Sequence, residues 1–311
     1  MDDEAKTDLL QILSCAFERK NLDGIVFLDI QKIFYYLRER LNDSNDIADS
    51  LQYYWYEDGC MSDTVKEAVD YGVEENILTA TSTQRTQNGN WYQFNEENDI
   101  STANHRDDLQ EAIETVEIVL SEDYDVFRGY EPKIKDLYEE APLPFQQYFK
   151  TKLLWYVEDV EKNNIQHRDA DKISSMIALG ESYLPLDRKY SDFNDVYSKY
   201  MNISQKYLEH SNGEHSGLFV VFSSLSKDMW ELFSKKLRIC EHDPYYDDKV
   251  EQWEDDYAEK QKQVMSLLLD FDRMVNAEFN DEEESVDPVS ESNGWSVVAD
   301  AYLSDVKAEL D

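Results

Sequence analysis

Residues 62–94 read SDTVKEAVDYGVEENILTATSTQRTQNGNWYQF, and this stretch decides the fold of the first part of the chain. Ser62 is a residue type that caps the N-terminus of a helix, and the residues after it predict a helix to about position 75. Residues 77–81 and 91–94 have the apolar and β-branched composition of strands. Asn88-Gly89 lies between them and favours a tight turn. The stretch therefore predicts a helix followed by a β-hairpin.

Two amphipathic segments precede this stretch. The first helix is expected over Ala5 to Arg19, and its apolar face consists of Leu9, Ile12, Leu13, Ala16 and Phe17. The second is expected to begin at Asp29 as its N-cap, and its apolar stripe consists of Ile30, Ile33, Phe34, Leu37 and Leu41. Three helices and a hairpin follow one another in the order of a winged helix, so residues 1–97 are predicted to form a winged-helix domain with a small β-hairpin wing.

The aromatic segment before Ser62 carries a resemblance. Residues 53–62, YYWYEDGCMS, are followed by a predicted helix and then by EENIL at 74–78. This arrangement resembles the signature Y-x-Y-G-P-x-S … L-x-x-x-G-[LI]-[IL] of Panacea-type antitoxin domains and related archaeal and bacterial winged-helix modules. Gly59-Cys60 stands where the family has Gly-Pro, and Asn76 stands where it has Gly. The resemblance covers about 30 of the 311 residues and implies that the aromatic segment packs under the third helix, with Ser62 capping that helix.

The rest of the chain predicts helices, so the fold class is mainly α, with a C-terminal helical bundle over residues 98–279. Ile173, Met176, Ile177 and Leu179 mark one of its helices. The most regular stripe, with a period of about 3.5 residues, consists of Val250, Trp253, Tyr257, Lys260, Val264, Leu267, Phe271 and Met274. Two hypotheses remain open for 250–274: pairing inside the bundle, or a homodimer seam in which Lys260 constrains the register.

Residues 280–311 are predicted to form an acidic linker and a terminal amphipathic helix. The apolar face of that helix, which is also the candidate partner-docking site, consists of Trp295, Val298, Tyr302, Val306 and Leu310. A helix this short is marginal in water by itself. It is therefore expected either to fold back on the bundle or to occupy the groove of a partner.

Acidic residues dominate the composition, with 68 acidic against 30 basic residues and a net charge of −38. Three explanations compete: adaptation to molar salt, mimicry of DNA by carboxylates, and an ordinary acidic protein. The excess is spread along the whole chain, which favours salt adaptation and a halophilic source, although Lys outnumbers Arg, against the usual habit of such proteins. The acidic N-terminus, three distant cysteines and short apolar runs favour a cytoplasmic protein without a membrane span.

Motifs of catalysis are missing from the sequence. His167-Arg168-Asp169 copies part of a kinase catalytic loop, but Ser174 stands where that loop requires Asn. Cys240-Glu241-His242 lacks the second spaced pair of a zinc site. The sequence therefore predicts a non-enzymatic protein with no catalytic residue, no metal site and no cofactor.

DNA and protein remain alternative ligands of the winged helix. The polar stretch from Thr79 to Asn90 suits phosphate contacts. The predicted DNA contacts are Ser62, Thr64, Lys66, Arg85 and Gln87. Against this, residues 1–95 hold 18 acidic and 8 basic residues. The hypotheses are a DNA-binding transcriptional regulator and a protein–protein interaction factor, antitoxin-like or host–virus.

Lowering KCl from molar concentration to about 0.1 M is expected to unfold the protein. The Debye length then grows from about 3 Å to about 10 Å, so the carboxylates repel one another without screening. Circular dichroism across a KCl titration checks this, and an unchanged spectrum at low salt would contradict salt adaptation.

Overall fold

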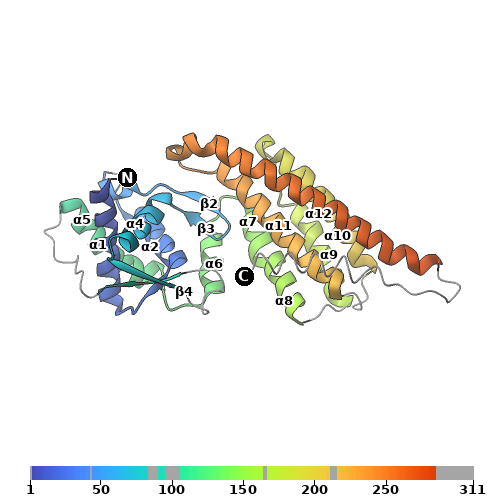
Figure 1. The fold of residues 1–311 in the computed structure, drawn as a ribbon, viewed down its shortest axis with the longest axis horizontal. Coiled ribbons are helices and arrows are strands. Elements are labelled where there is room, and N and C mark those ends of the chain that lie inside the picture. The colour runs from blue at the N-terminus through green and yellow to red at the C-terminus, as the bar shows by residue number, and fades with distance from the viewer. Residues whose placement is uncertain are drawn as a thin grey trace. The chain divides into compact units, whose positions relative to one another are not determined.

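A computed structural model describes residues 2–42, 44–82, 90–95, 106–163, 167–210 and 216–284. The chain is mainly helical with a small antiparallel sheet, as the sequence predicted (Figure 1). It divides into two compact units: unit 1 contains residues 1–142 and 234–257, and unit 2 contains residues 143–233 and 258–311. The domain limits at 97/98 and 279/280 stay predictions, and the first of them lies outside the described residues.

Unit 1 begins with helices that alternate with short strands. Its elements are α1 (Asp3–Lys20), β1 (Ile25–Val26), α2 (Phe27–Arg40), α3 (Asp46–Ser50), β2 (Tyr54–Tyr56), β3 (Gly59–Met61), α4 (Asp63–Glu74), β4 (Leu78–Ser82), β5 (Asn90–Phe94), α5 (Asp107–Ile118) with a π-helical end (Val119–Asp123), and α6 (Tyr130–Glu139). The chain returns to this unit at residues 234–257, which include a 3-10 turn at Pro244–Lys249.

Unit 2 consists of helices. They are α7 (Pro144–Tyr148), a π-helical segment (Phe149–Leu154), α8 (Trp155–Asn163), α9 (His167–Glu181), a 3-10 turn (Arg188–Tyr190), α10 (Ser191–His210), α11 (Ser216–Cys240) and α12 (Val250–Glu284). The last residues of α11 and the first of α12 belong to unit 1. Residues 280–284, predicted to begin a linker, continue α12.

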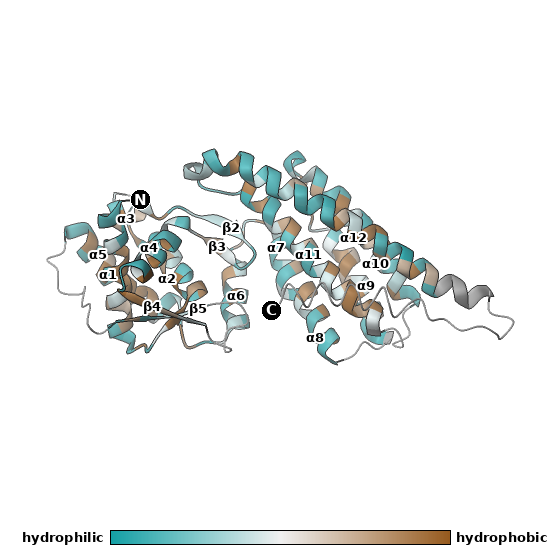
Figure 2. Cartoon of the chain, in the orientation of Figure 1, coloured by the Kyte–Doolittle hydropathy of each residue, from teal (hydrophilic) through white to brown (hydrophobic). Residues whose placement is uncertain are grey.

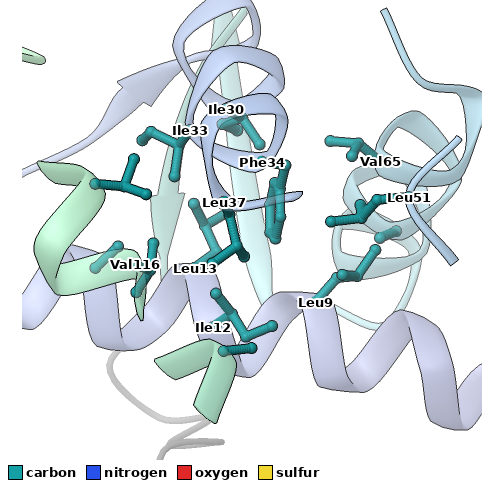
Figure 3. Close-up of a cluster of buried hydrophobic side chains, with 14 of the residues drawn as sticks. Leu9, Ile12, Leu13, Ile30, Ile33, Phe34, Leu37, Leu51, Val65 and Val116 are labelled. Atoms are coloured by element: carbon teal, nitrogen blue, oxygen red, sulfur yellow. The ribbon is translucent and has the colours of Figure 1, made fainter. Parts of the chain in front are cut away.

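The core of unit 1 forms where α1, α2, α4 and α5 meet, as Figure 3 shows for the side chains that point toward one another. The labelled residues are Leu9, Ile12 and Leu13 of α1, Ile30, Ile33, Phe34 and Leu37 of α2, Leu51, Val65 of α4 and Val116 of α5. Each such side chain stabilises the fold by about 1.5–3 kcal/mol when it leaves water. The apolar stripes predicted for the first two helices are therefore confirmed.

The sheet of unit 1 has the order β1–β5–β4, and both pairings are antiparallel. Strands β4 and β5 pair from Leu78 with Phe94 to Ser82 with Asn90, which confirms the predicted hairpin strands. Strand β1 was not predicted: Ile25 pairs with Tyr92 and Val26 with Trp91. Two residues are too few to show the alternating pattern of a strand.

The predicted start of the second helix at Asp29 is wrong. Helix α2 begins at Phe27 with Val26 as its N-cap, so Asp29 lies inside the first turn. Its carboxylate is buried and accepts hydrogen bonds from the Tyr124 hydroxyl and from Lys133 Nζ, the latter at 2.9 Å. Asp29 therefore joins α2 to the chain around α6 instead of capping a helix.

The aromatic segment forms an unpredicted second hairpin, β2–β3, with Glu57-Asp58 at its turn. Gly59 follows the turn with φ of +103°, a conformation that favours glycine. Trp55 of β2 pairs with Cys60 of β3. The sequence Asp58-Gly59 is a hairpin signal that the aromatic run obscured.

The implied packing of this segment under the third helix differs from what the structure contains. Tyr53 packs on Tyr35 of α2 at 5.5 Å between ring centroids, and Trp55 packs on Tyr138 of α6 at 5.8 Å. The Tyr54 ring lies 5.0 Å from that of Trp253, and its hydroxyl bonds Asp63 at the start of α4. Tyr54 therefore contacts other partners than Tyr53 and Trp55, because successive residues of a strand point to opposite faces.

The buried stripe of α12 consists of Trp253, Tyr257, Lys260, Val264, Leu268, Phe271 and Val275. Its mean period is close to 3.7 residues, so the predicted 3.5-residue period, with Leu267 and Met274, is wrong beyond Val264. A period of this length keeps the stripe on one face of a straight helix. Much of the α12 ribbon has the colour of hydrophilic residues in Figure 2.

The buried stripe of α12 contacts other helices of the same chain. Inside unit 2, Lys260 Nζ lies 2.7 Å from Asp228 of α11 and also pairs with Glu231, and the Phe271 ring packs on Tyr207 of α10. These contacts favour the intramolecular hypothesis over a homodimer seam through 250–274.

Burial of Lys32 makes the stability of unit 1 depend on pH. The side chain is 2% exposed and donates to the Cys60 carbonyl at 2.8 Å, and burial lowers the pKa of its ammonium group to about 8. Below pH 8 the folded protein bears the full cost of burying the charge, and this cost vanishes as pH rises toward the unfolded pKa near 10.4. The free energy of unfolding, compared with that of Lys32→Met, is therefore expected to rise by on the order of 3 kcal/mol from pH 8 to 10.5.

Urea unfolding of both proteins across this pH range measures the difference, and the comparison cancels the titration of the tyrosines. A difference that does not change with pH would show that Lys32 keeps an ordinary pKa.

Candidate interaction surface

The N-terminus of α4 is fixed by buried polar contacts. Ser62 Oγ accepts a hydrogen bond from the Val65 amide, which confirms Ser62 as the N-cap. The fully buried side chain of Gln31 bonds both backbone groups of Ser62, at 2.8 Å to its amide and 3.0 Å to its carbonyl. Ser62 and Thr64 are 1% and 5% exposed, so neither side chain is available to contact DNA. Ser62 and Thr64 are therefore no longer candidate DNA contacts.

The exposed side of α4 is acidic with one apolar residue. We call it the α4 face, and it consists of Lys66, Glu67, Asp70, Val73 and Glu74. Lys66 Nζ lies 2.7 Å from Asp70, and this hydrogen bond raises the pKa of the lysine. The single cation of the face is thus already paired with Asp70, and the face also carries Glu67, Glu74 and the 38% exposed Val73.

The strands next to α4 expose uncharged side chains. These are Thr79, Thr81, Ser82 and Asn90. The Thr81 hydroxyl donates to the Trp91 carbonyl across the hairpin. Arg85 and Gln87, the two predicted DNA contacts between the strands, lie outside the described residues.

Lys66 is the one member of the α4 face among the predicted DNA contacts. The signal for the other members was present, since buried Val65, Ala68, Val69 and Gly72 leave the intervening positions on the opposite side of a helix. A DNA-binding site favours hydroxyl, amide and basic side chains, so a DNA-binding interpretation gives the carboxylates and Val73 no role.

A hollow of about 440 Å³ lies between α1 and the start of α5. Its lining includes Asp8, Tyr71 and Arg106. Burial raises the pKa of the Asp8 carboxyl against the opposing effect of Arg106. Arg106 also pairs with Glu4 and Asp108, so the guanidinium is already shared among three carboxylates.

Asp169 and His242 belong to the two motifs that resemble a catalytic loop and a metal site, and both contact other side chains of the fold. Asp169, near the start of α9, accepts a hydrogen bond from the Tyr156 hydroxyl at 2.9 Å. His242 Nε2 lies 3.2 Å from Asp247 and its ring packs on Trp253. Burial raises the pKa of the Cys60 thiol to about 12, which keeps it protonated. Within the described ranges, no group of three His, Cys, Asp or Glu side chains is arranged to hold a metal ion.

The described helices and the comparisons with known proteins give two further findings. No helix in the described part combines the length and apolar character that crossing a bilayer requires. Comparison with protein-family models, curated proteins and solved structures gives no match. The terminal residues Trp295, Val298, Tyr302, Val306 and Leu310 lie outside the described residues.

Replacing Ser62 by Ala is expected to lower the free energy of unfolding by about 1 kcal/mol, because the amide of Val65 loses its cap. Lys66→Ala is expected to cost less than about 0.5 kcal/mol, because an exposed i,i+4 ion pair contributes little. Urea unfolding in molar KCl measures both, and equal losses would contradict the structural role of Ser62.

Proposed function

We propose that residues 2–95 form a winged-helix module that docks a partner protein, so that the chain acts by binding and not by catalysis. The order of elements supports the module: α1, β1, α2 and α4 are followed by the hairpin β4–β5, with β1 completing the sheet. In this interpretation α4 is the third helix of the module. Helix α3 and the hairpin β2–β3 are an insertion between its second and third helices.

The charges of the α4 face favour a protein ligand over DNA. Winged helices that bind DNA gain much of their affinity from cations that neutralise phosphates and release counterions. The α4 face offers three carboxylates and a lysine already bonded to Asp70. A phosphate backbone would meet repulsion there, whereas a basic or neutral protein surface would not.

Val73 gives such a surface its apolar contact. It is 38% exposed among charged neighbours, so a partner that covers it would bury an apolar side chain inside a polar rim. In molar salt the charges are screened, so burial of Val73 and hydrogen bonds to the carboxylates would supply most of the affinity.

A second candidate, a DNA-binding transcriptional regulator, is favoured by the hairpin. The exposed side chains of β4 and β5 are uncharged hydrogen-bonding groups, and the sequence places Arg85 and Gln87 between these strands. Such groups bond phosphates and base edges. In this version the hairpin contacts DNA and the α4 face does not.

Val73→Asp is expected to reduce the yield of a partner protein that copurifies with the tagged full chain by about tenfold or more, which is the loss of a central interface residue. Purification from the source cells at their own salt concentration, quantified by mass spectrometry, measures it. Leu269→Asp is the matched control, since Leu269 is exposed on α12 and lies outside the module.

DNA binding by the same proteins decides the alternative. Genomic fragments retained selectively in about 2 M KCl, lost with Arg85→Glu and kept with Val73→Asp, would overturn protein docking through α4 and establish the regulator. Partner yields that fall equally with Val73→Asp and Leu269→Asp would also contradict the proposal.

A further inference from the structure

Exposed apolar side chains gather where α9 ends in unit 2. Leu179, Tyr183 and Leu186 are 48%, 38% and 100% exposed, and we call them the α9-end patch. The sequence placed Leu179 on the apolar stripe of its helix, and the structure corrects this, because Ile173 and Ile177 form the buried side. Leu179 lies in the last turn of α9, and Tyr183 lies in the turn that follows, where the Ser182 amide donates to the Leu179 carbonyl and the Tyr183 amide donates to the Gly180 carbonyl.

Packing holds the patch in place. The Tyr183 ring lies 4.8 Å from that of Tyr148, whose hydroxyl donates to the Met176 carbonyl. The carbonyl of Pro185 accepts a hydrogen bond from Asn194 of α10 at 2.9 Å. Leu186 therefore extends into solvent from a turn that is tied down on both sides, and its exposure is a feature of the fold.

The charge around the patch is unusual for this chain. Residues 179–190, LGESYLPLDRKY, span the patch and contain two acidic and two basic residues in a protein of net charge −38. An acidic ligand that most of the chain would repel meets no net repulsion here. The patch thus combines apolar area with the charge balance that an acidic amphipathic segment needs.

We propose that the C-terminal segment of the same chain, residues 293–311, binds the α9-end patch. The sequence of this segment repeats apolar residues at helical spacing, and these are Trp295, Val298, Tyr302, Val306 and Leu310. Residues 293–311 hold four acidic residues and one lysine, which complements the basic pair Arg188-Lys189. A helix of this length is marginal in water, so it gains stability only against a surface such as this one.

The chain is long enough to reach the patch. Helix α12 runs beside α10 in the same direction, because Gln261 bonds Asp192 and Lys206 bonds Asp272. Gln261 is therefore level with the start of α10. Glu284 lies about 35 Å farther along the axis of α12. Ten residues, 285–294, span up to about 33–36 Å when extended, which matches this distance, so the length of the chain allows residues 295–311 to reach the patch.

Hydrogen exchange of the full chain tests the proposal. Amides of residues 296–310 are expected to exchange at least about tenfold more slowly than those of an unstructured peptide. The double variant Leu179→Asp/Leu186→Asp removes the apolar contact and is expected to return them to within about twofold of that rate. Leu269→Asp, an equally exposed leucine on α12, is expected to keep the slow exchange.

Three results would overturn the proposal. Unprotected amides in the natural chain would show that the segment does not bind this protein. Protection that survives Leu179→Asp/Leu186→Asp would place it elsewhere. Protection that falls on dilution, together with a dimer in sedimentation, would assign the patch to the segment of a second copy. None of these outcomes bears on the α4 face, so the test is independent of the proposed function.

Discussion

A pair of hydrogen bonds between Tyr53 and Asp243 joins segments that are 190 residues apart in the chain. The Tyr53 amide donates to the Asp243 carboxylate at 2.7 Å, and the Asp243 amide donates to the Tyr53 carbonyl at 3.0 Å. Closing so long a loop costs entropy, and the cost grows only slowly with length. Two bonds alone offset little of it, so the remainder must come from neighbouring contacts.

The neighbours of this junction supply them. Arg38 pairs with Asp243 at 3.0 Å, and Tyr246 donates from its hydroxyl to the Gln52 carbonyl. The rings of Tyr54, Tyr246 and Trp253 pack together at centroid distances of 5.0 to 5.6 Å. Because of this cluster, residues 234–257 belong to unit 1 although they follow most of unit 2 in the sequence. The hairpin β2–β3 is the element of unit 1 that receives them.

Scarcity of cations shapes the electrostatics of the chain. With 30 basic residues for 68 acidic ones, single cations serve several carboxylates. Arg106 pairs with three, and Arg40 and Lys260 with two each. Where such a cation is buried, as Lys260 is, the contact fixes how helices pack; where it is exposed, as Lys66 is, little charge remains for an external ligand. The proposal that the α4 face docks a protein and not a polyanion rests on this scarcity of cations.

Local sequence determined the elements whose signals are short-range. The apolar stripes of α1 and α2, the cap of α4 and the strands β4 and β5 followed from patterns within about a dozen residues, because a helix or hairpin is closed by its own neighbours. Of the α4 face, the predicted DNA contacts included Lys66 but not Val73 or the carboxylates. Arg85, Gln87 and the terminal apolar residues remain sequence predictions.

Tertiary structure decided what depends on distant partners. Ser62 and Thr64 are buried because α2 and its Gln31 lie over the start of α4, and no local pattern reports that. Strand β1 exists only because β5, more than 60 residues later, pairs with it. Leu179 and Leu186 are likewise exposed because no other described part of the chain packs over them. Burial is a property of the assembled chain, so a sequence fixes which residues can be apolar contacts and the fold fixes which of them are left for a ligand.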